Sequence, residues 1–145
     1  MTSTMDKRVT EHLQRLTQYL YELENINNTP KNKFLESTLL TAATERYFQL
    51  AIETCINIGN RIISIEQFNK TIKAPESYSD IFIQLERAGL IDKDLSERLI
   101  KMTKFRNRLV HVYWDLDPSM LYDYLNNNLQ DFHLFIRKVN SYYTD

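Results

Sequence analysis

Apolar residues recur along this chain in steps of three and four, which is the spacing of one face of an α-helix. Near the start the step is carried by Val9, Leu13, Leu16, Leu20 and Leu23. Such a repeat places these side chains along one stripe of a helical cylinder. The pattern therefore predicts an amphipathic helix over residues 5–26.

A longer helix is predicted over residues 31–67, with Thr29 as its N-cap and Pro30 in its first turn. Two neighbouring apolar lines run along it: Ala51, Cys55, Ile58, Ile62 and Ile65, and Phe48, Ile52, Ile56, Gly59 and Ile63. This face is wider than a peripheral helix needs. We expect the helix to be central in a bundle or to pack partly against another subunit.

The pattern lapses over residues 68–77, where Pro75 disfavours a helical residue before it. A shorter helix is predicted over residues 78–88, and Gly89 stands where a left-handed C-cap would be. Asp92 or Asp94 can then cap a fourth helix. The expected buried stripe of that helix is Leu95, Leu99, Met102, Arg106, Leu109 and Tyr113.

The last helix is expected to open with Asp117 as N-cap and Pro118 in the first turn. It runs almost to the end of the chain, with an apolar stripe of Leu121, Leu125, Phe132, Phe135, Val139 and Tyr142. The whole chain holds two Gly and three Pro, too few for the many turns of an all-β protein. These patterns predict an all-α fold, an antiparallel bundle of four to five helices in a single domain over residues 1–145.

Arg106 stands on the predicted buried stripe of the fourth helix. Removing an unpaired guanidinium from water costs several kcal/mol, so Arg106 needs an acidic partner, a cleft or a ligand anion. A carboxylate such as Glu53 could provide a purely structural ion pair. The alternatives stay open at the level of sequence.

Composition narrows the possible partners. The formal net charge is −1, so contact with nucleic acid would need a local basic cluster. Lys101, Lys104 and Arg108 form such a cluster around Arg106, although the same charges also suit a solvated helix end that complements the macrodipole. Cys55 is the only cysteine and is expected to be a buried small hydrophobe.

No segment approaches the roughly 20 apolar residues of a membrane span, so we expect a soluble cytoplasmic protein with no membrane contact. Spacings typical of metal ligands are absent from the sequence, and His12 and His133 are expected at the surface. We therefore expect neither a metal nor another cofactor.

The stretch 101–117 carries the candidate chemistry. Arg106, His111 and Tyr113 form an R-x4-H-x-Y pattern, and Asn107 directly follows the Arg. On an ideal helix Arg106 and His111 would point about 140° apart. The site then requires either that the helix unwinds around residues 110–113 or that two copies of the motif meet across a two-fold axis.

These residue types suit metal-free cleavage of RNA by its own 2′-hydroxyl. An imidazole such as His111 can take or give a proton near neutral pH. Arg106 can bind phosphate through two N–H groups and stabilise the charge that develops at phosphorus. Asn107 could orient the phosphate or His111, and the expected product is a 2′,3′-cyclic phosphate.

The motif, the order of the helices and the stretch ETCINIGNRI resemble the HEPN-domain toxins of the HepT type. The resemblance implies a homodimeric ribonuclease, acting on tRNA or mRNA, with the motif Arg and His of both protomers in a shared cleft. It also implies that a minimal nucleotidyltransferase antitoxin silences the toxin by attaching AMP to the motif tyrosine, Tyr113. Glu53 and Asn60 match the family's polar positions on the long helix, whereas Asn57 stands where Asp is common.

Two other functions remain compatible with the sequence. The chain could be a non-catalytic helical module that binds nucleotide or serves as the accessory subunit of a nucleotidyltransferase, with Arg106 holding a phosphate. It could also be a scaffold dimer in which Arg106 and His111 form a structural network. Trp114 could stack a base, but is more simply an aromatic plug at the helix end.

Overall fold

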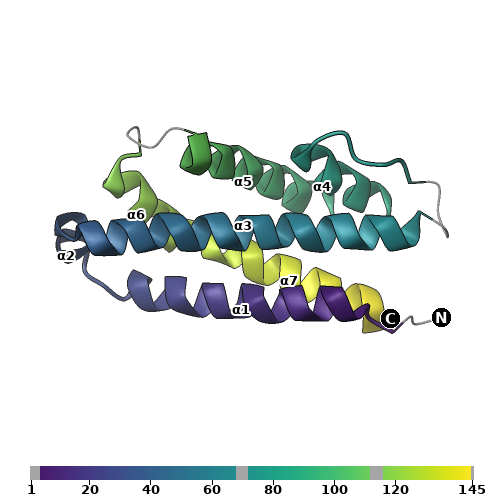
Figure 1. Cartoon of the computed structure of the whole chain (residues 1–145), viewed down its shortest axis with the longest axis horizontal. Coiled ribbons are helices and arrows are strands. Elements are labelled where there is room, and N and C mark those ends of the chain that lie inside the picture. Colours follow the sequence, from purple (N-terminus) through teal and green to yellow (C-terminus); the bar gives the residue numbers. More distant parts are fainter. Residues whose placement is uncertain (1–3, 68–71, 112–115, 145) are drawn as a thin grey trace.

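The computed structural model describes residues 4–67, 72–111 and 116–144. All regular secondary structure in these ranges is helical, which confirms the predicted all-α class (Figure 1). The helices are α1 (Lys7–Asn27), α2 (Lys31–Glu36), α3 (Thr38–Glu66), α4 (Tyr78–Arg87), α5 (Lys93–His111), α6 (Pro118–Asn127) and α7 (Leu129–Thr144).

The first helix agrees closely with its predicted range. Asp6 is the N-cap, and its carboxylate accepts a hydrogen bond from the amide of Arg8 at 3.1 Å. The five apolar residues that predicted α1 are all buried, and Ile26 extends their stripe. This face packs along α3, which runs antiparallel to α1 beside it (Figure 1).

The prediction of one long helix over residues 31–67 is wrong. Ser37 adopts an extended conformation with φ −102° and ψ 105°, and its hydroxyl accepts the amide of Leu40 at 3.1 Å. A serine that caps a new helix in this way ends the previous one, so α2 and α3 are separate. The predicted cap at Thr29 is also wrong, because Pro30 occupies the N-cap position with no side-chain bond.

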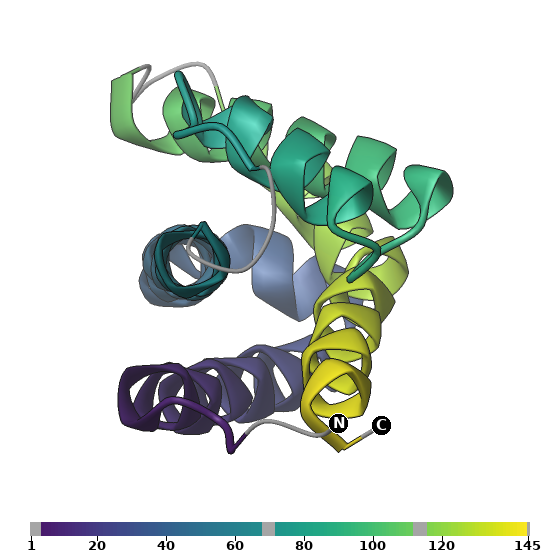
Figure 2. The ribbon, with the colours of Figure 1, turned by 90° about the vertical axis from the view of Figure 1, so that its right-hand side faces the viewer.

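Helix α3 packs between α1 and the pair formed by α4 and α5, at one side of the molecule (Figure 2). It contacts α1 on one side and α4, α5 and α6 on others, so the wide apolar face is explained within one chain (Figure 2). At Gly59 helix α4 comes very close, since a Cβ built there would lie 2.6 Å from Ile81 Cγ2 and 3.2 Å from Leu85 Cδ1. Cys55 is buried as expected, and burial raises the pKa of its thiol.

Helices α4 and α5 form a hairpin over one half of α3. Gly89 has φ +81°, which confirms the predicted left-handed C-cap. Asp92, rather than Asp94, caps α5, because its carboxylate accepts the amide of Leu95 at 2.8 Å. The predicted stripe of α5 omitted Phe105, which is buried and stacks on Tyr124 with ring centroids 3.9 Å apart.

The predicted final helix is also divided in two. Asp117 caps α6 as expected and Pro118 is its first residue, but the helix ends at Asn127, and α7 begins after Asn128. Three consecutive asparagines, a poor helix-forming sequence, lie at this break. Tyr143 rather than Tyr142 is the tyrosine that is buried near the end of α7. None of the described helices has the length and apolarity that crossing a bilayer requires.

Candidate functional site

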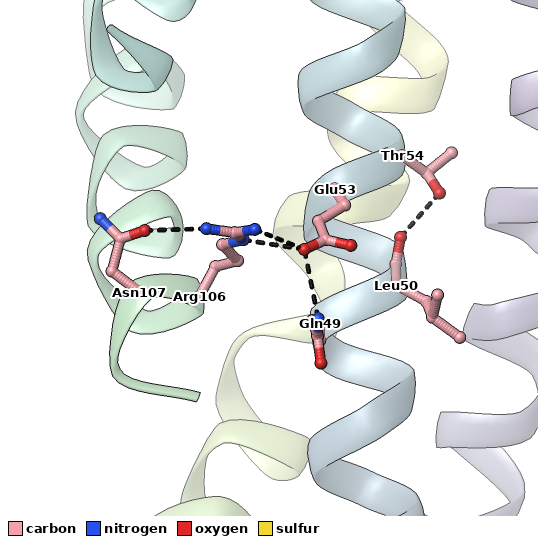
Figure 3. A network of polar contacts seen from close by, with 6 residues as sticks. All are labelled: Gln49, Leu50, Glu53, Thr54, Arg106 and Asn107. Atoms are coloured by element: carbon pink, nitrogen blue, oxygen red, sulfur yellow. Dashed lines mark hydrogen bonds and ion pairs between the residues drawn. The ribbon is translucent and has the colours of Figure 1, made fainter. Parts of the chain in front are cut away.

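Arg106 spans the gap between α5 and α3 and pairs with Glu53. The Nε and Nη2 atoms of Arg106 lie 2.9 and 2.7 Å from the same oxygen, Glu53 Oε2 (Figure 3). Gln49, one turn earlier on α3, also donates to that oxygen at 3.3 Å. The Arg106 side chain is 16% exposed and that of Glu53 29%, so Arg106 has an acidic partner at the edge of the core.

The pairing with Glu53 orients the Arg106 guanidinium and leaves some of its N–H groups available for other partners. Its Nη1 atom donates to Asn107 Oδ1 at 3.2 Å, next to Arg106 on the same helix (Figure 3). A guanidinium carries five N–H groups, and three of them are used in these contacts. Two N–H groups therefore remain for a ligand anion.

Arg106, Asn107 and His111 line one open pocket of about 430 Å³, which we call the His111 pocket. Its remaining lining residues are Ser77, Tyr78, Ser79 and Thr103. Helix α5 stays regular through His111, so it does not unwind at Val110 within the described residues. The prediction that a regular helix could not bring Arg106 and His111 to one cleft is therefore wrong, because both residues line this pocket from α5 within one chain.

A second pocket of about 400 Å³ adjoins the first, which we call the Asn57 pocket. It shares Tyr78 and Arg106 with the His111 pocket, and α3 supplies the rest of its lining: Glu53, Ile56, Asn57 and Asn60. The polar positions on α3 that the sequence singled out thus lie beside Arg106. Asn57 and Asn60 are exposed, as a solvent-facing helix edge would be.

Tyr78 is a pocket residue that the sequence did not indicate. It begins α4, and the Arg106 Cζ atom lies over its ring at 5.4 Å from the ring centroid. Ser77 holds the start of the helix by accepting the amide of Asp80 at 3.0 Å, and Ser79 bonds Thr103 of α5 at 3.0 Å. A single aromatic at a helix start has no periodic signal, so only the fold shows its position.

The predicted basic cluster is divided between two regions. Lys104 and Arg108 are exposed and, by helical geometry, lie within about 60° of His111 around α5. Lys101 and Arg98 line a different pocket, of about 190 Å³, beside the buried Asp131. Arg98 is engaged there, with Nη1 3.0 Å from Asp131 Oδ1 and Nε 3.1 Å from Asp94 Oδ2.

Several other predictions concern residues away from these pockets. Tyr113 and Trp114 lie outside the described residues. His133 is partly exposed and pairs with Glu24. His12 is partly buried, and burial together with the nearby Arg15 lowers its pKa. Among the described residues, no group of three His, Cys, Asp or Glu side chains is placed to hold a metal ion.

Comparison with known proteins places this chain in a family. A family model described as "Ribonuclease HepT-like" matches residues 9–139. The chain is 29% identical over 144 residues to the tRNA nuclease HepT of Aphanizomenon flos-aquae, covering 98% of this chain and 94% of the relative. It is 35% identical over 93 residues to the mRNA nuclease HepT of Shewanella oneidensis, covering 64% of this chain and 67% of the relative.

Solved structures agree with this match. A tri-AMPylated Shewanella oneidensis HEPN toxin in complex with MNT antitoxin superposes with a TM-score of 0.85 at 25% identity, covering 94% of this chain and 99% of that chain. The cytosolic protein YutE of Bacillus subtilis, of unknown function, shares the fold with a TM-score of 0.73 at 21% identity, covering 92% and 89% of the two chains. With the family model spanning most of its length, the chain belongs to the HepT-like ribonuclease family.

Proposed function

We propose that this protein is a metal-independent endoribonuclease toxin of a toxin–antitoxin pair. The observation that supports this best is the His111 pocket, where Arg106, Asn107 and His111 line one open space in a chain of the HepT-like family. The names of two relatives, a tRNA nuclease and an mRNA nuclease, support RNA as the substrate class.

In the proposed reaction the 2′-oxygen of one nucleotide attacks the adjacent phosphorus and the bond to the 5′-oxygen breaks. His111 takes the proton from the 2′-hydroxyl or gives one to the departing 5′-oxygen. Arg106 uses its two remaining N–H groups to stabilise the charge on the phosphoryl oxygens, worth roughly 3 kcal/mol by analogy with other fixed donors. The products are a 2′,3′-cyclic phosphate and a free 5′-hydroxyl.

A homodimer would complete this chemistry. One imidazole cannot act as base and acid in the same step, whereas His111 of a second protomer could supply the other proton transfer. Two copies of the surface carrying Lys104 and Arg108 would also double the local positive charge for the RNA backbone.

We further propose that AMP attached to Tyr113 by a nucleotidyltransferase antitoxin silences the site. Tyr113 is two residues from His111 in the chain, and an added phosphate anion could pair with Arg106 in place of the RNA phosphate. A tri-AMPylated HEPN toxin in complex with MNT antitoxin is among the similar structures, which supports this form of control.

Incubation of purified protein with total RNA in EDTA, followed by mapping of the cleaved ends, tests the nuclease proposal. We expect wild type and the control His133→Ala to cut RNA and leave cyclic phosphates, and Arg106→Ala and His111→Ala to leave RNA intact. Intact RNA with wild type at high concentration, while mass spectrometry shows Tyr113 unmodified, would contradict the proposal.

The second candidate is a non-catalytic module that binds nucleotide or assists a nucleotidyltransferase. The pairing of Arg106 with Glu53 favours this candidate, because a guanidinium that Glu53 holds in place can bind a phosphate without any catalysis. This reading predicts that wild type does not arrest growth when expressed alone, yet binds the nucleotidyltransferase. Growth arrest that His111→Ala relieves supports the toxin instead.

A further inference from the structure

Tyr78 is unusual among the large apolar side chains of the described residues because nearly half of it is exposed beside the candidate site. Its exposed fraction is 47%. The side chain lines both the His111 pocket and the Asn57 pocket, and so stands at the border between them. The other strongly exposed tyrosine, Tyr21 at 58%, lies on α1 and lines neither pocket.

The surroundings hold the Tyr78 backbone in place. Ser77 caps the first turn of α4, and the hydroxyls of Ser79 and Thr103 join that turn to α5. The Arg106 guanidinium lies over the ring, 5.4 Å from its centroid. The ring is therefore presented next to the proposed phosphate-binding group by a fixed helix start, with much of its surface still in solvent.

This arrangement has the features of a stacking surface for a nucleobase. Proteins recognise single-stranded RNA by stacking unpaired bases on Tyr, Phe, Trp or Arg planes. A base joined to a phosphate held by Arg106 would be within one nucleotide of the Tyr78 ring. Asn57 and Asn60, which line the adjoining pocket, offer amide donors and acceptors in the direction of α3.

We propose that Tyr78 stacks the base of a nucleotide that flanks the scissile phosphate, and so helps to place single-stranded RNA on Arg106 and His111. The proposal rests on the proposed ribonuclease function. It makes Tyr78 a substrate-binding residue with no part in proton transfer. The alternative is that Tyr78 supports Arg106 through the cation–π contact alone.

Short single-stranded RNAs, each with one abasic nucleotide at a different position, distinguish the two roles. Cleavage is measured for wild type, Tyr78→Ala, Tyr78→Phe and the control Tyr21→Ala, and RNA binding is measured in parallel on the His111→Ala background. On intact RNA we expect Tyr78→Ala to lower kcat/KM and affinity about 5- to 150-fold, the range of one lost base stack. Tyr78→Phe and Tyr21→Ala should stay close to wild type.

The decisive result is the coupling between the protein change and the RNA change. If a base stacks on Tyr78, an abasic nucleotide at one position lowers the RNA affinity of the protein that keeps Tyr78 by about the factor that Tyr78→Ala does. The same abasic nucleotide does not lower the RNA affinity of Tyr78→Ala any further. If the loss of affinity from Tyr78→Ala multiplies the loss from the abasic nucleotide at every position, the proposal is overturned. Tyr78 then only supports Arg106. An unchanged affinity of Tyr78→Ala for intact RNA would also overturn it.

The binding measurements separate this proposal from the nuclease proposal. If the RNAs bind with the expected coupling but wild type cuts none of them, the nuclease function fails, and Tyr78 stacks a base of RNA that the protein binds without cutting. If wild type cuts RNA and no coupling is found, the nuclease function stands and the stacking role of Tyr78 fails. The melting temperature of Tyr78→Ala, expected within a few degrees of wild type, shows whether the start of α4 is retained.

Discussion

One carboxylate oxygen, Glu53 Oε2, accepts two hydrogen bonds from Arg106, at 2.9 and 2.7 Å across the space between α3 and α5. The two residues are 53 positions apart in the sequence. Both N–H groups converge on one oxygen, and Asn107 takes a third, so the guanidinium is held in one orientation. We infer that Glu53 is a positioning residue, which acts on a bound phosphate through Arg106.

Glu53→Ala should therefore reduce both stability and activity. Removing the partner leaves a partly buried guanidinium without its carboxylate, at a cost of about 1–3 kcal/mol. Because Arg106 can then move, we expect kcat/KM to fall by roughly tenfold or more. Urea unfolding and cleavage assays measure the two effects, with Glu45→Ala on the same helix as control.

Glu53→Gln provides the finer comparison. The amide keeps an oxygen that can accept from Arg106 but loses the charge, so we expect an intermediate loss of stability and activity. A double-mutant cycle with Arg106→Ala gives the coupling energy. Losses that simply add in that cycle would show that the two residues act independently.

The division of the basic residues leads to a second prediction. Lys104 and Arg108 are closer to His111 along α5 than Lys101 is, and Lys101 lines the pocket beside Asp131. Each side chain that contacts an RNA phosphate contributes about −0.7 to the slope of log K against log salt for single strands. We expect Lys104→Ala and Arg108→Ala each to weaken RNA binding and make this slope less steep by about that amount.

Lys101→Ala is the matched control for that measurement, since it removes the same charge from the same helix. Salt titrations of RNA binding on the His111→Ala background avoid turnover during the assay. Equal changes of slope for all three variants would mean that RNA contacts the whole helix rather than the region around His111.

The positions of the helices could be predicted from the sequence more accurately than the points at which the helices break. Apolar periodicity identifies α1 and the buried side of α3, because burial on one face imposes that spacing. The breaks at Ser37 and Asn128 interrupt the backbone without interrupting the run of apolar residues, so the pattern continued across them. At Ser37 the break comes from the serine hydroxyl, which caps the start of α3. Apolar periodicity carries no signal for such a side-chain cap.

The motif residues of the site could be predicted from the sequence, but the residues that other helices place around them could not. Arg106, Asn107 and His111 are close in sequence and were named from their motif, but the ideal helical spacing of Arg106 and His111 did not predict that both line one pocket. Glu53 could be named as one candidate partner for Arg106, but only the packing of α3 against α5 selects it. Tyr78 could not be found, since its place beside Arg106 depends on the approach of α4 to α3 and α5.

That approach leads to a third prediction, at Gly59. Alanine favours a helix over glycine by about 1 kcal/mol, but its Cβ would lie 2.6 Å from the branched side chain of Ile81. Forcing extra atoms into a packed contact costs about 1–3 kcal/mol. We expect Gly59→Ala to be destabilising by ~1 kcal/mol net.

Thermal unfolding of Gly59→Ala beside Ser64→Ala, an exposed position on the same helix, tests this balance. The control gains helix propensity without a clash and should be neutral or slightly stabilising. Because α4 carries Tyr78, displacement of α4 should also weaken RNA binding by Gly59→Ala. A more stable Gly59→Ala protein would show that α4 moves aside at little cost.

A fourth prediction concerns the hydroxyl of Tyr143 near the end of α7. Tyr143 is 7% exposed, and its hydroxyl is buried with no hydrogen-bond partner among the described residues. Burial, with a smaller effect of Glu66, raises the pKa of Tyr143 to about 12. An unfolded tyrosine ionises near pH 10, so above that pH the unfolded state loses a proton that the folded state keeps.

Stability should therefore fall as the pH rises from about 10 towards 12, and Tyr143→Phe should make this fall less steep. It should not abolish the fall, because burial also raises the pKa of the Cys55 thiol and of Tyr124. At neutral pH Tyr143→Phe removes an unpaired buried hydroxyl, so we expect it to be neutral or stabilising by up to ~1 kcal/mol. Urea unfolding from pH 7 to 11.5 measures both effects, and Tyr21→Phe, at an exposed position, should reproduce the wild-type pH curve. A Tyr143→Phe protein that is less stable than wild type at pH 7 would mean that the hydroxyl has a partner in solution.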